Sequence, residues 1–98
     1  MNDKDSKTIS SPMEETKELH IRYLRAISNP IRREILRILK NQSMTTTDLQ
    51  TKTRIDTKNL KWHLDILEWA DCVVKDSTNL EIKYSLTQYG KVVDYVDK

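Results

Sequence analysis

Hydrophobic positions along this chain repeat first with the period of a helix and then, after residue 70, with the alternating period of a strand. Residues 13–28 place four apolar side chains on one helical face, and their acidic side chains come early, where they complement the helix dipole. The four are Leu19, Tyr23, Leu24 and Ile27. The pattern predicts a helix over residues 13–28.

A second helix is predicted to begin at the dipeptide Asn29-Pro30. Asparagine is a favourable N-cap and proline fits the first helical position, so IRREILRILKN is expected to be helical. Its apolar residues Ile31, Ile35, Ile38 and Leu39 are expected to point inward, and its basic residues Arg32, Arg33, Arg37 and Lys40 mostly outward.

Two further helices follow, separated by a tight link. Thr45, followed three residues later by Asp48, approximates a capping box for a short helix that ends near Thr53. Asp56 is the expected N-cap of the next helix, over residues 56–70. Two short helices joined by so brief a turn indicate a helix-turn-helix.

Residues 56–70, DTKNLKWHLDILEWA, carry two apolar stripes. The first consists of Leu60, Leu64 and Leu67, and the second of Trp62, Ile66 and Trp69. Both tryptophans face nearly opposite the leucine stripe. Because a short soluble helix rarely has two hydrophobic surfaces, the sequence raises the question of what Trp62 and Trp69 contact.

Alternation after Ala70 predicts a β-hairpin over residues 73–86. Polar side chains separate the apolar residues Leu80, Ile82, Tyr84 and Leu86, and the intervening DSTN supplies turn residues. Thr87 then caps a last helix, whose stripe consists of Tyr89, Val92, Val93 and Val96. The order is four helices, a hairpin and a helix, which predicts a mainly α fold of the α+β type, the winged helix-turn-helix.

Composition adds limits to this picture. Ninety-eight residues make one domain, expected over residues 13–98, after a polar and flexible tail at residues 1–12. Residues 1–18 hold three basic and five acidic side chains, whereas the remainder holds 14 and 10, so the positive charge belongs to the folded part. A net charge of +2 permits contact with nucleic acid without requiring it.

Several function classes are not expected. The single cysteine, Cys72, excludes an internal disulfide and suits a reducing compartment. No signal peptide and no run of 18 apolar residues is present, so a soluble, cytoplasmic protein without membrane contact is expected. An enzyme is not expected, and neither is a cofactor, because the chain lacks a glycine-rich phosphate loop, a carboxylate pair and a nucleophile beside a base.

Three stretches resemble the ArsR-like, or arsenic-repressor-type, winged-helix transcription regulators. They are LRAISNPIRREILRIL (24–39), NLKWHLDILEWADCV (59–73) and YSLTQYG (84–90). Asp71 stands where the family usually has glycine. The segments in which metal-sensing members carry ligands contain neither cysteine nor histidine here, so no metal is expected. The resemblance implies a sequence-specific DNA-binding regulator, of the repressor type, that acts as a homodimer.

The resemblance also implies that helix 56–70 enters the major groove of double-stranded DNA and that hairpin 73–86 is the wing. Lysine neutralises phosphate, asparagine pairs with adenine, and thymine methyls accept apolar contacts. The candidate DNA-contacting residues are Thr45, Thr46, Thr57, Lys58, Asn59, Lys61, Trp62, Lys75, Ser77, Thr78, Asn79 and Lys83. The alternative is an ordinary solvated face that happens to include a tryptophan.

Four other side chains have two interpretations each. Trp69 is expected to pack on the hairpin or on a partner subunit. Asp65 either accepts from cytosine or lies at the edge of the interface. His63 is either a structural residue or a ligand or pH-sensitive group, and Cys72 is either a buried small residue or a redox switch, the structural role being favoured for both.

The resemblance further implies dimerisation through residues 13–28 and 87–98. The candidate interface residues are Leu19, Tyr23, Tyr89, Val92, Val93 and Val96. A two-fold dimer would set two recognition helices about 34 Å apart on a palindromic site. A different hypothesis remains open, in which the domain is a protein-interaction module that docks partners on the Trp62/Trp69 face.

Overall fold

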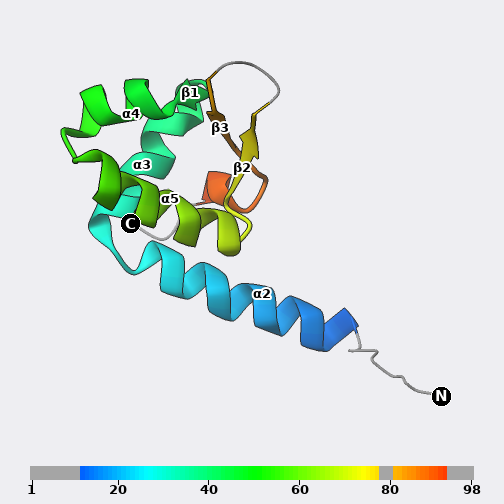
Figure 1. The fold of residues 1–98 in the computed structure, drawn as a ribbon. Coiled ribbons are helices and arrows are strands. Elements are labelled where there is room, and N and C mark those ends of the chain that lie inside the picture. The colour runs from blue at the N-terminus through cyan, green and yellow to red at the C-terminus, as the bar shows by residue number, and fades with distance from the viewer. Residues whose placement is uncertain (1–11, 78–80, 93–98) are drawn as a thin grey trace.

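The computed structural model describes residues 12–77 and 81–92, and the predicted winged helix-turn-helix is confirmed (Figure 1). The helices are α2 (Pro12–Ile27), α3 (Pro30–Asn41), α4 (Thr46–Thr53) and α5 (Thr57–Trp69), followed by the short 3-10 helix η1 (Gly90–Val92). The strands are β1 (Met44–Thr45), β2 (Val73–Asp76) and β3 (Lys83–Leu86). The expected tail lies outside the described residues except for Pro12, which is the first residue of α2. Residues 93–98 of the expected last helix also lie outside the described residues.

The predicted N-caps of α3, α4 and α5 are each confirmed by a side-chain hydrogen bond. The Asn29 Oδ1 atom accepts from the amide of Ile31 at 2.7 Å. Thr45 Oγ1 and the Asp56 carboxylate each accept from the amide three residues further on, at 3.1 and 3.3 Å. Because such caps satisfy the free N–H groups of a first helical turn, the starts of α3, α4 and α5 follow from local sequence.

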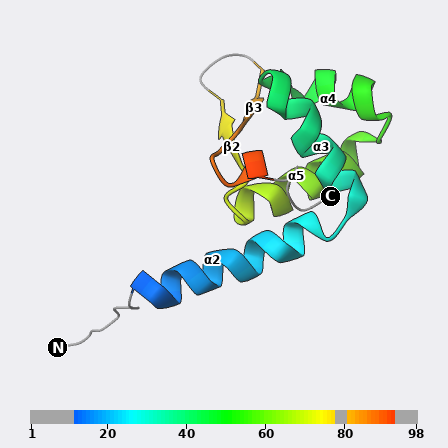
Figure 2. The ribbon, with the colours of Figure 1, turned by 180° about the vertical axis from the view of Figure 1, so that it is seen from behind.

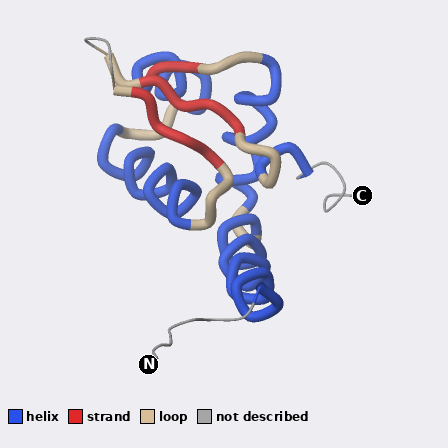
Figure 3. The backbone as a smooth tube through the Cα atoms, turned by 90° about the vertical axis from the view of Figure 1, so that its right-hand side faces the viewer, coloured by secondary structure: helices blue, strands red, loops and turns tan. Residues whose placement is uncertain are grey.

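The three strands form one antiparallel sheet in the order β1-β3-β2, and Figure 3 shows them side by side. Tyr84 in the middle strand lies opposite Met44 on one side and Lys75 on the other. The hairpin was predicted, but β1 was not, because two residues are too few to show an alternating pattern. β1 connects α3 to α4 and so joins the helix-turn-helix to the wing.

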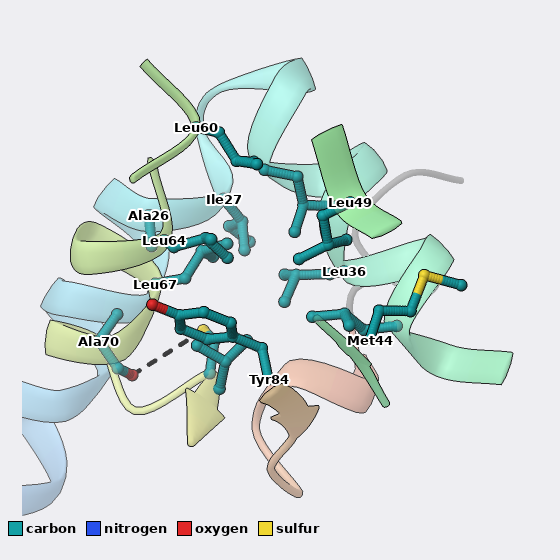
Figure 4. Packing of buried hydrophobic residues seen from close by; sticks show 14 of the residues in the cluster. Ala26, Ile27, Leu36, Met44, Leu49, Leu60, Leu64, Leu67, Ala70 and Tyr84 are labelled. Atoms are coloured by element: carbon teal, nitrogen blue, oxygen red, sulfur yellow. Dashed lines mark hydrogen bonds between the residues drawn. The ribbon is translucent and has the colours of Figure 1, made fainter. Parts of the chain in front are cut away.

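The leucine stripe of α5 forms the centre of the core (Figure 4). Leu60, Leu64 and Leu67 are completely buried, among residues from the other helices and from the sheet. Burying one such side chain contributes about 1.5–3 kcal/mol relative to leaving it exposed. The cluster consists of Tyr23, Ala26, Ile27, Ile35, Leu36, Leu39, Met44, Leu49, Leu60, Leu64, Leu67, Ala70, Cys72, Val73 and Tyr84.

Helix α2 contacts this core only through its C-terminal half, and the rest of it extends away from the body (Figures 1 and 2). Tyr23, Ala26 and Ile27 are buried, whereas residues 15–18 are all exposed. None of the helices in the described part of the chain is long and apolar enough to cross a membrane.

Several predicted orientations are wrong. Leu24, Ile31 and Ile82 were expected to be buried, but each is more than 40% exposed. The buried face of α3 is rotated toward Leu36, which is completely buried. As a result Ile31, at the N-terminal end of the predicted apolar face, is exposed. Arg32 was expected outward and is only 7% exposed.

The burial of Arg32 follows from its hydrogen bonds. Its Nε atom donates to the carbonyl of Ala26 at 2.6 Å, and Nη2 donates to the carbonyl of Arg25 at 3.3 Å. Both carbonyls belong to the last turn of α2, where the helix supplies few N–H groups, and the Arg25 carbonyl also accepts from the amide and the hydroxyl of Ser28. A residue at the start of α3 thereby fixes the end of α2.

The same guanidinium reaches α5. Arg32 Nη1 lies 3.2 Å from His63 Nδ1. An arginine only donates, so Nδ1 is the acceptor and the ring proton is on Nε2. Burial, and then the charge of Arg32, lower the pKa of His63 and keep the ring neutral. His63 is therefore a buried structural residue, as favoured from the sequence.

The corner after α5 is closed by residues of the YSLTQYG stretch. Asp71 adopts the left-handed conformation (φ 65°), as expected for a position that is usually glycine in the family. Thr87 Oγ1 donates to the Asp71 carbonyl at 2.5 Å and accepts from the Gly90 amide at 3.2 Å. A Cβ atom on Gly90 would lie 2.3 Å from the Cys72 carbonyl oxygen, so only glycine fits there.

We expect Arg32→Met to lower the free energy of unfolding by about 2–3 kcal/mol, because it keeps the apolar stem and removes the hydrogen bonds to α2 and to His63. Urea unfolding of both proteins measures the difference. Arg25→Met, which removes an exposed arginine side chain in the last turn of α2, is the control and should change stability by less than about 0.5 kcal/mol. An equal loss in the two variants would contradict this role of Arg32.

Candidate nucleic-acid interface

The outer face of α5 carries a hollow near its N-terminal half. Five side chains line it, four of them predicted DNA contacts and the fifth the carboxylate whose role was left open: Lys58, Asn59, Lys61, Trp62 and Asp65. All five residues are exposed, and Trp62 most conspicuously, at 57%. The geometry thus brings together a large aromatic ring, an amide and two amines on the second helix of the helix-turn-helix.

Two neighbouring side chains, Arg32 and His63, contact the Trp62 ring. The Arg32 guanidinium carbon lies 5.6 Å from the centre of the Trp62 ring, within the range of a cation–π contact. The His63 ring meets it edge-on, with centroids 5.0 Å apart and planes at 61°. These contacts restrict the indole while leaving more than half of the residue in solvent. Arg32 was missed as a supporting residue, since its contact with α5 depends on tertiary packing.

Polar side chains on the same face are paired with one another. Asn59 Nδ2 donates to Asp56 Oδ1 at 2.7 Å, and this bond is the main cause of the lowered pKa of the Asp56 carboxyl. Lys61 Nζ lies 3.3 Å from Asp65. Such an exposed ion pair contributes about 0–1 kcal/mol, so the lysine can exchange Asp65 for another anion.

The start of α4 lies beside the wing because of β1. Thr45 of β1 is paired with Lys83 of β3. A second hollow here is lined by Thr45, Thr46, Thr47, Glu81 and Ile82. Thr45 Oγ1 accepts the capping hydrogen bond and so retains its own O–H as a donor. Thr57, at the start of α5, accepts from the side chain of Gln50 on α4 at 3.0 Å.

The wing residues are only partly described. Lys75 lies 3.8 Å from Glu68 of α5, whereas Ser77 and Lys83 are exposed. Two other predicted contacts, Thr78 and Asn79, lie outside the described residues. The hairpin therefore adds one basic side chain next to the start of α4 and a second one already engaged with α5.

Trp69 contacts α2. The Arg22 guanidinium carbon of α2 lies 5.3 Å from the centre of its ring, and Trp69 remains 44% exposed. Arg22 is also 3.4 Å from Glu18. The end of α5 therefore lies against α2, a neighbour that the sequence did not suggest for Trp69. The two tryptophans are supported by arginines from different helices.

Cys72 and the histidines do not form a reactive centre. Cys72 is completely buried, and burial, followed by the charge of Asp71, raises the pKa of its thiol to about 12. The thiol is therefore protonated at neutral pH, as expected for a small core residue. His20 is exposed. Within residues 12–77 and 81–92, no three histidine, cysteine or acidic side chains gather as a metal site would require.

The predicted dimer residues divide into three groups. Leu19 is half-buried and Tyr89 is 45% exposed, and both line a hollow beside α2 together with Thr16, His20 and Tyr23. Tyr23, only 7% exposed, is a core residue of the single chain, although it also lines this hollow. The third group lies outside what the structure describes: Val93 and Val96 entirely, and Val92 except for its backbone.

Comparison with known proteins agrees with this fold. Residues 29–75 match the family model described as "Bacterial regulatory protein, arsR family". The transcriptional repressor SdpR from Bacillus subtilis is 37% identical over 62 residues, which are 63% of this chain and 69% of SdpR.

Solved structures with lower identity share the fold. HlyU from Vibrio cholerae has a TM-score of 0.74 at 21% identity, over 86% of this chain and 94% of its own. The homodimeric winged helix-turn-helix DNA-binding domain of Mb0332 from Mycobacterium bovis has a TM-score of 0.79 at 16% identity, over 94% and 87%. NolR from Sinorhizobium fredii has a TM-score of 0.72 at 24% identity, over 94% of each chain.

The matched residues run from the N-cap of α3 to the middle of β2, so they include the whole helix-turn-helix and the hollow on α5. From its sequence relatives and its fold together, this chain belongs to the ArsR family of bacterial transcription regulators and carries their winged helix-turn-helix DNA-binding domain.

Proposed function

We propose that this protein is a sequence-specific repressor that binds double-stranded DNA in the cytoplasm as a homodimer, with α5 in the major groove and the β2–β3 hairpin as wing. The observation that carries the proposal is the hollow on α5, where Trp62, Asn59 and two lysines are exposed together on the recognition helix. The repressor role is supported by the likeness to SdpR, itself a transcriptional repressor.

The chemistry of this face suits the edges of base pairs. Lys58 and Lys61 supply positive charge for phosphate or for the acceptors of guanine. Asn59 offers the donor and acceptor that adenine requires, and the exposed Trp62 ring offers an apolar surface to a thymine methyl group. In the free protein Lys61 forms an ion pair with Asp65, and on DNA binding it exchanges this carboxylate for a phosphate.

Contacts outside α5 position the duplex. Thr45 and Thr46 at the start of α4 supply hydroxyl donors to one phosphate strand, and Thr57 supplies another at the start of α5. Lys75, Ser77 and Lys83 of the wing approach the neighbouring backbone, as do Thr78 and Asn79. With so few basic side chains on the wing, salt weakens binding less steeply than in a heavily basic regulator.

The homodimer is proposed from the projecting half of α2. Residues 15–18 of this half are all exposed, and the hollow beside it includes the partly exposed Leu19 and Tyr89. The similar domain of Mb0332 is homodimeric. A two-fold pair formed through α2 and residues 87–98 sets two copies of α5 about 34 Å apart, one turn of DNA.

Alanine substitution tests the proposed recognition face. We expect Trp62→Ala to weaken binding to a selected duplex roughly tenfold, and Lys61→Ala to weaken it and to reduce the salt dependence by about one phosphate contact for each half-site. Fluorescence anisotropy across a salt series measures both, with Lys40→Ala in the last turn of α3 as the control for lost charge. Unchanged affinity in both variants would refute the proposal that this face of α5 contacts DNA. Burial of a tryptophan by a protein partner, with no affinity for DNA, would favour a protein-interaction module.

A charge at position 19 tests the dimer. We expect Leu19→Glu to make the protein monomeric at micromolar concentration, because two copies would bring two carboxylates into one apolar contact. Sedimentation velocity measures the mass. Ile31→Glu, which adds the same charge at an exposed apolar residue of α3, should leave the dimer intact. A dimeric Leu19→Glu protein would place the interface elsewhere.

A further inference from the structure

We propose that Asp56 is a positioning residue that sets the base preference of Asn59, an inference that rests on the proposed DNA recognition by α5. The Asp56 carboxylate binds both the backbone amide and the side-chain amide of Asn59. Asp56 Oδ2 accepts from the Asn59 backbone amide at 3.3 Å, and Oδ1 accepts from the side-chain Nδ2 atom at 2.7 Å. The first bond is an ordinary N-cap, whereas the second serves no need of the helix.

The second bond fixes the orientation of the Asn59 amide. An ionised carboxylate only accepts hydrogen bonds, so the NH₂ group of Asn59 must face Asp56 and the amide oxygen must face away. The bond itself lowers the pKa of the Asp56 carboxyl further below neutral pH, where the group is ionised. The amide thus presents its oxygen and one remaining N–H outward.

One acceptor and one donor are what adenine requires. In the major groove adenine shows the N6 donor beside the N7 acceptor, whereas guanine shows two acceptors, N7 and O6. An unrestrained asparagine can turn its NH₂ group toward guanine and donate twice. With one N–H already given to Asp56, Asn59 has a single donor left for the base, so guanine is left with an unpaired acceptor.

The negative charge of Asp56 is expected to weaken DNA binding. Asp56 brings a negative charge to the end of α5 that approaches phosphate, and this repulsion weakens binding to every sequence alike. Serine would cap the helix as well as aspartate does, without the charge. The carboxylate therefore trades general affinity for discrimination at one base pair in each half-site.

Asp56→Ser separates the two bonds, because the single hydroxyl oxygen of serine is taken by the Asn59 backbone amide. The test first selects bound duplexes from a random pool with the full-length protein. Anisotropy then compares the selected duplex with one in which the adenine attributed to Asn59 is replaced by guanine. We expect Asp56→Ser to keep the thermal midpoint, to bind all sequences more tightly, and to reduce the preference for adenine about fivefold.

Two variants separate positioning from lost charge. Asp65→Asn removes one negative charge from the hollow that includes Asn59 without removing a bond to Asn59, and should raise affinity for both duplexes with no change in their ratio. In an Asn59→Ala background, Asp56→Ser should leave the ratio unchanged, because the residue it positions is absent.

The outcomes distinguish this inference from the proposed function. A wild-type protein that selects no sequence overturns the proposed function. A wild-type protein that selects a site, but keeps the same adenine preference after Asp56→Ser, overturns only the role of Asp56. A selected site whose preferences are all unaffected by Asn59→Ala overturns it as well.

Discussion

The guanidinium of Arg32 joins the three helices on which the proposed interface depends. It stands at the start of α3, binds the last carbonyls of α2, contacts His63 of α5, and lies behind the Trp62 ring. Burying a charge without partners is costly, and here the partners are two helix-end carbonyls and a neutral imidazole nitrogen. Because one group satisfies all of these contacts, the helix that projects toward the proposed dimer partner and the helix that faces DNA are positioned by the same side chain.

Much of this fold could be predicted from local sequence. Asn29, Thr45 and Asp56 act through hydrogen bonds to amides two or three residues away, so their caps do not depend on the rest of the chain. The leucine stripe of α5 is evident from helical spacing, and its complete burial confirms it. The left-handed Asp71 likewise follows from its place after a helix. The order of the elements was predicted from the same caps and apolar spacings, and the family resemblance rests on short stretches that contain them.

What could not be predicted depends on contacts between distant segments. An arginine between isoleucines on α3 has the pattern of a solvated side chain, and only the approach of α2 and α5 shows why Arg32 is buried. Strand β1 exists because β3 offers it a partner, and Trp69 lies against α2 because that helix crosses the end of α5. The bond between Asp56 and the Asn59 side chain was within reach of the sequence, since residues three apart at a helix start are neighbours.

We infer that the hollow on α5 contacts base pairs, whereas the far end of the same helix contacts protein. NMR titration of the ¹⁵N-labelled protein with a selected duplex tests it most directly, because the two indole N–H signals report on Trp62 and Trp69 separately. We expect large shifts for the indole of Trp62 and for the amides of residues 57–62, with the Trp69 indole nearly unchanged. Shifts concentrated at Trp69 and along α2, with Trp62 unmoved, would contradict it.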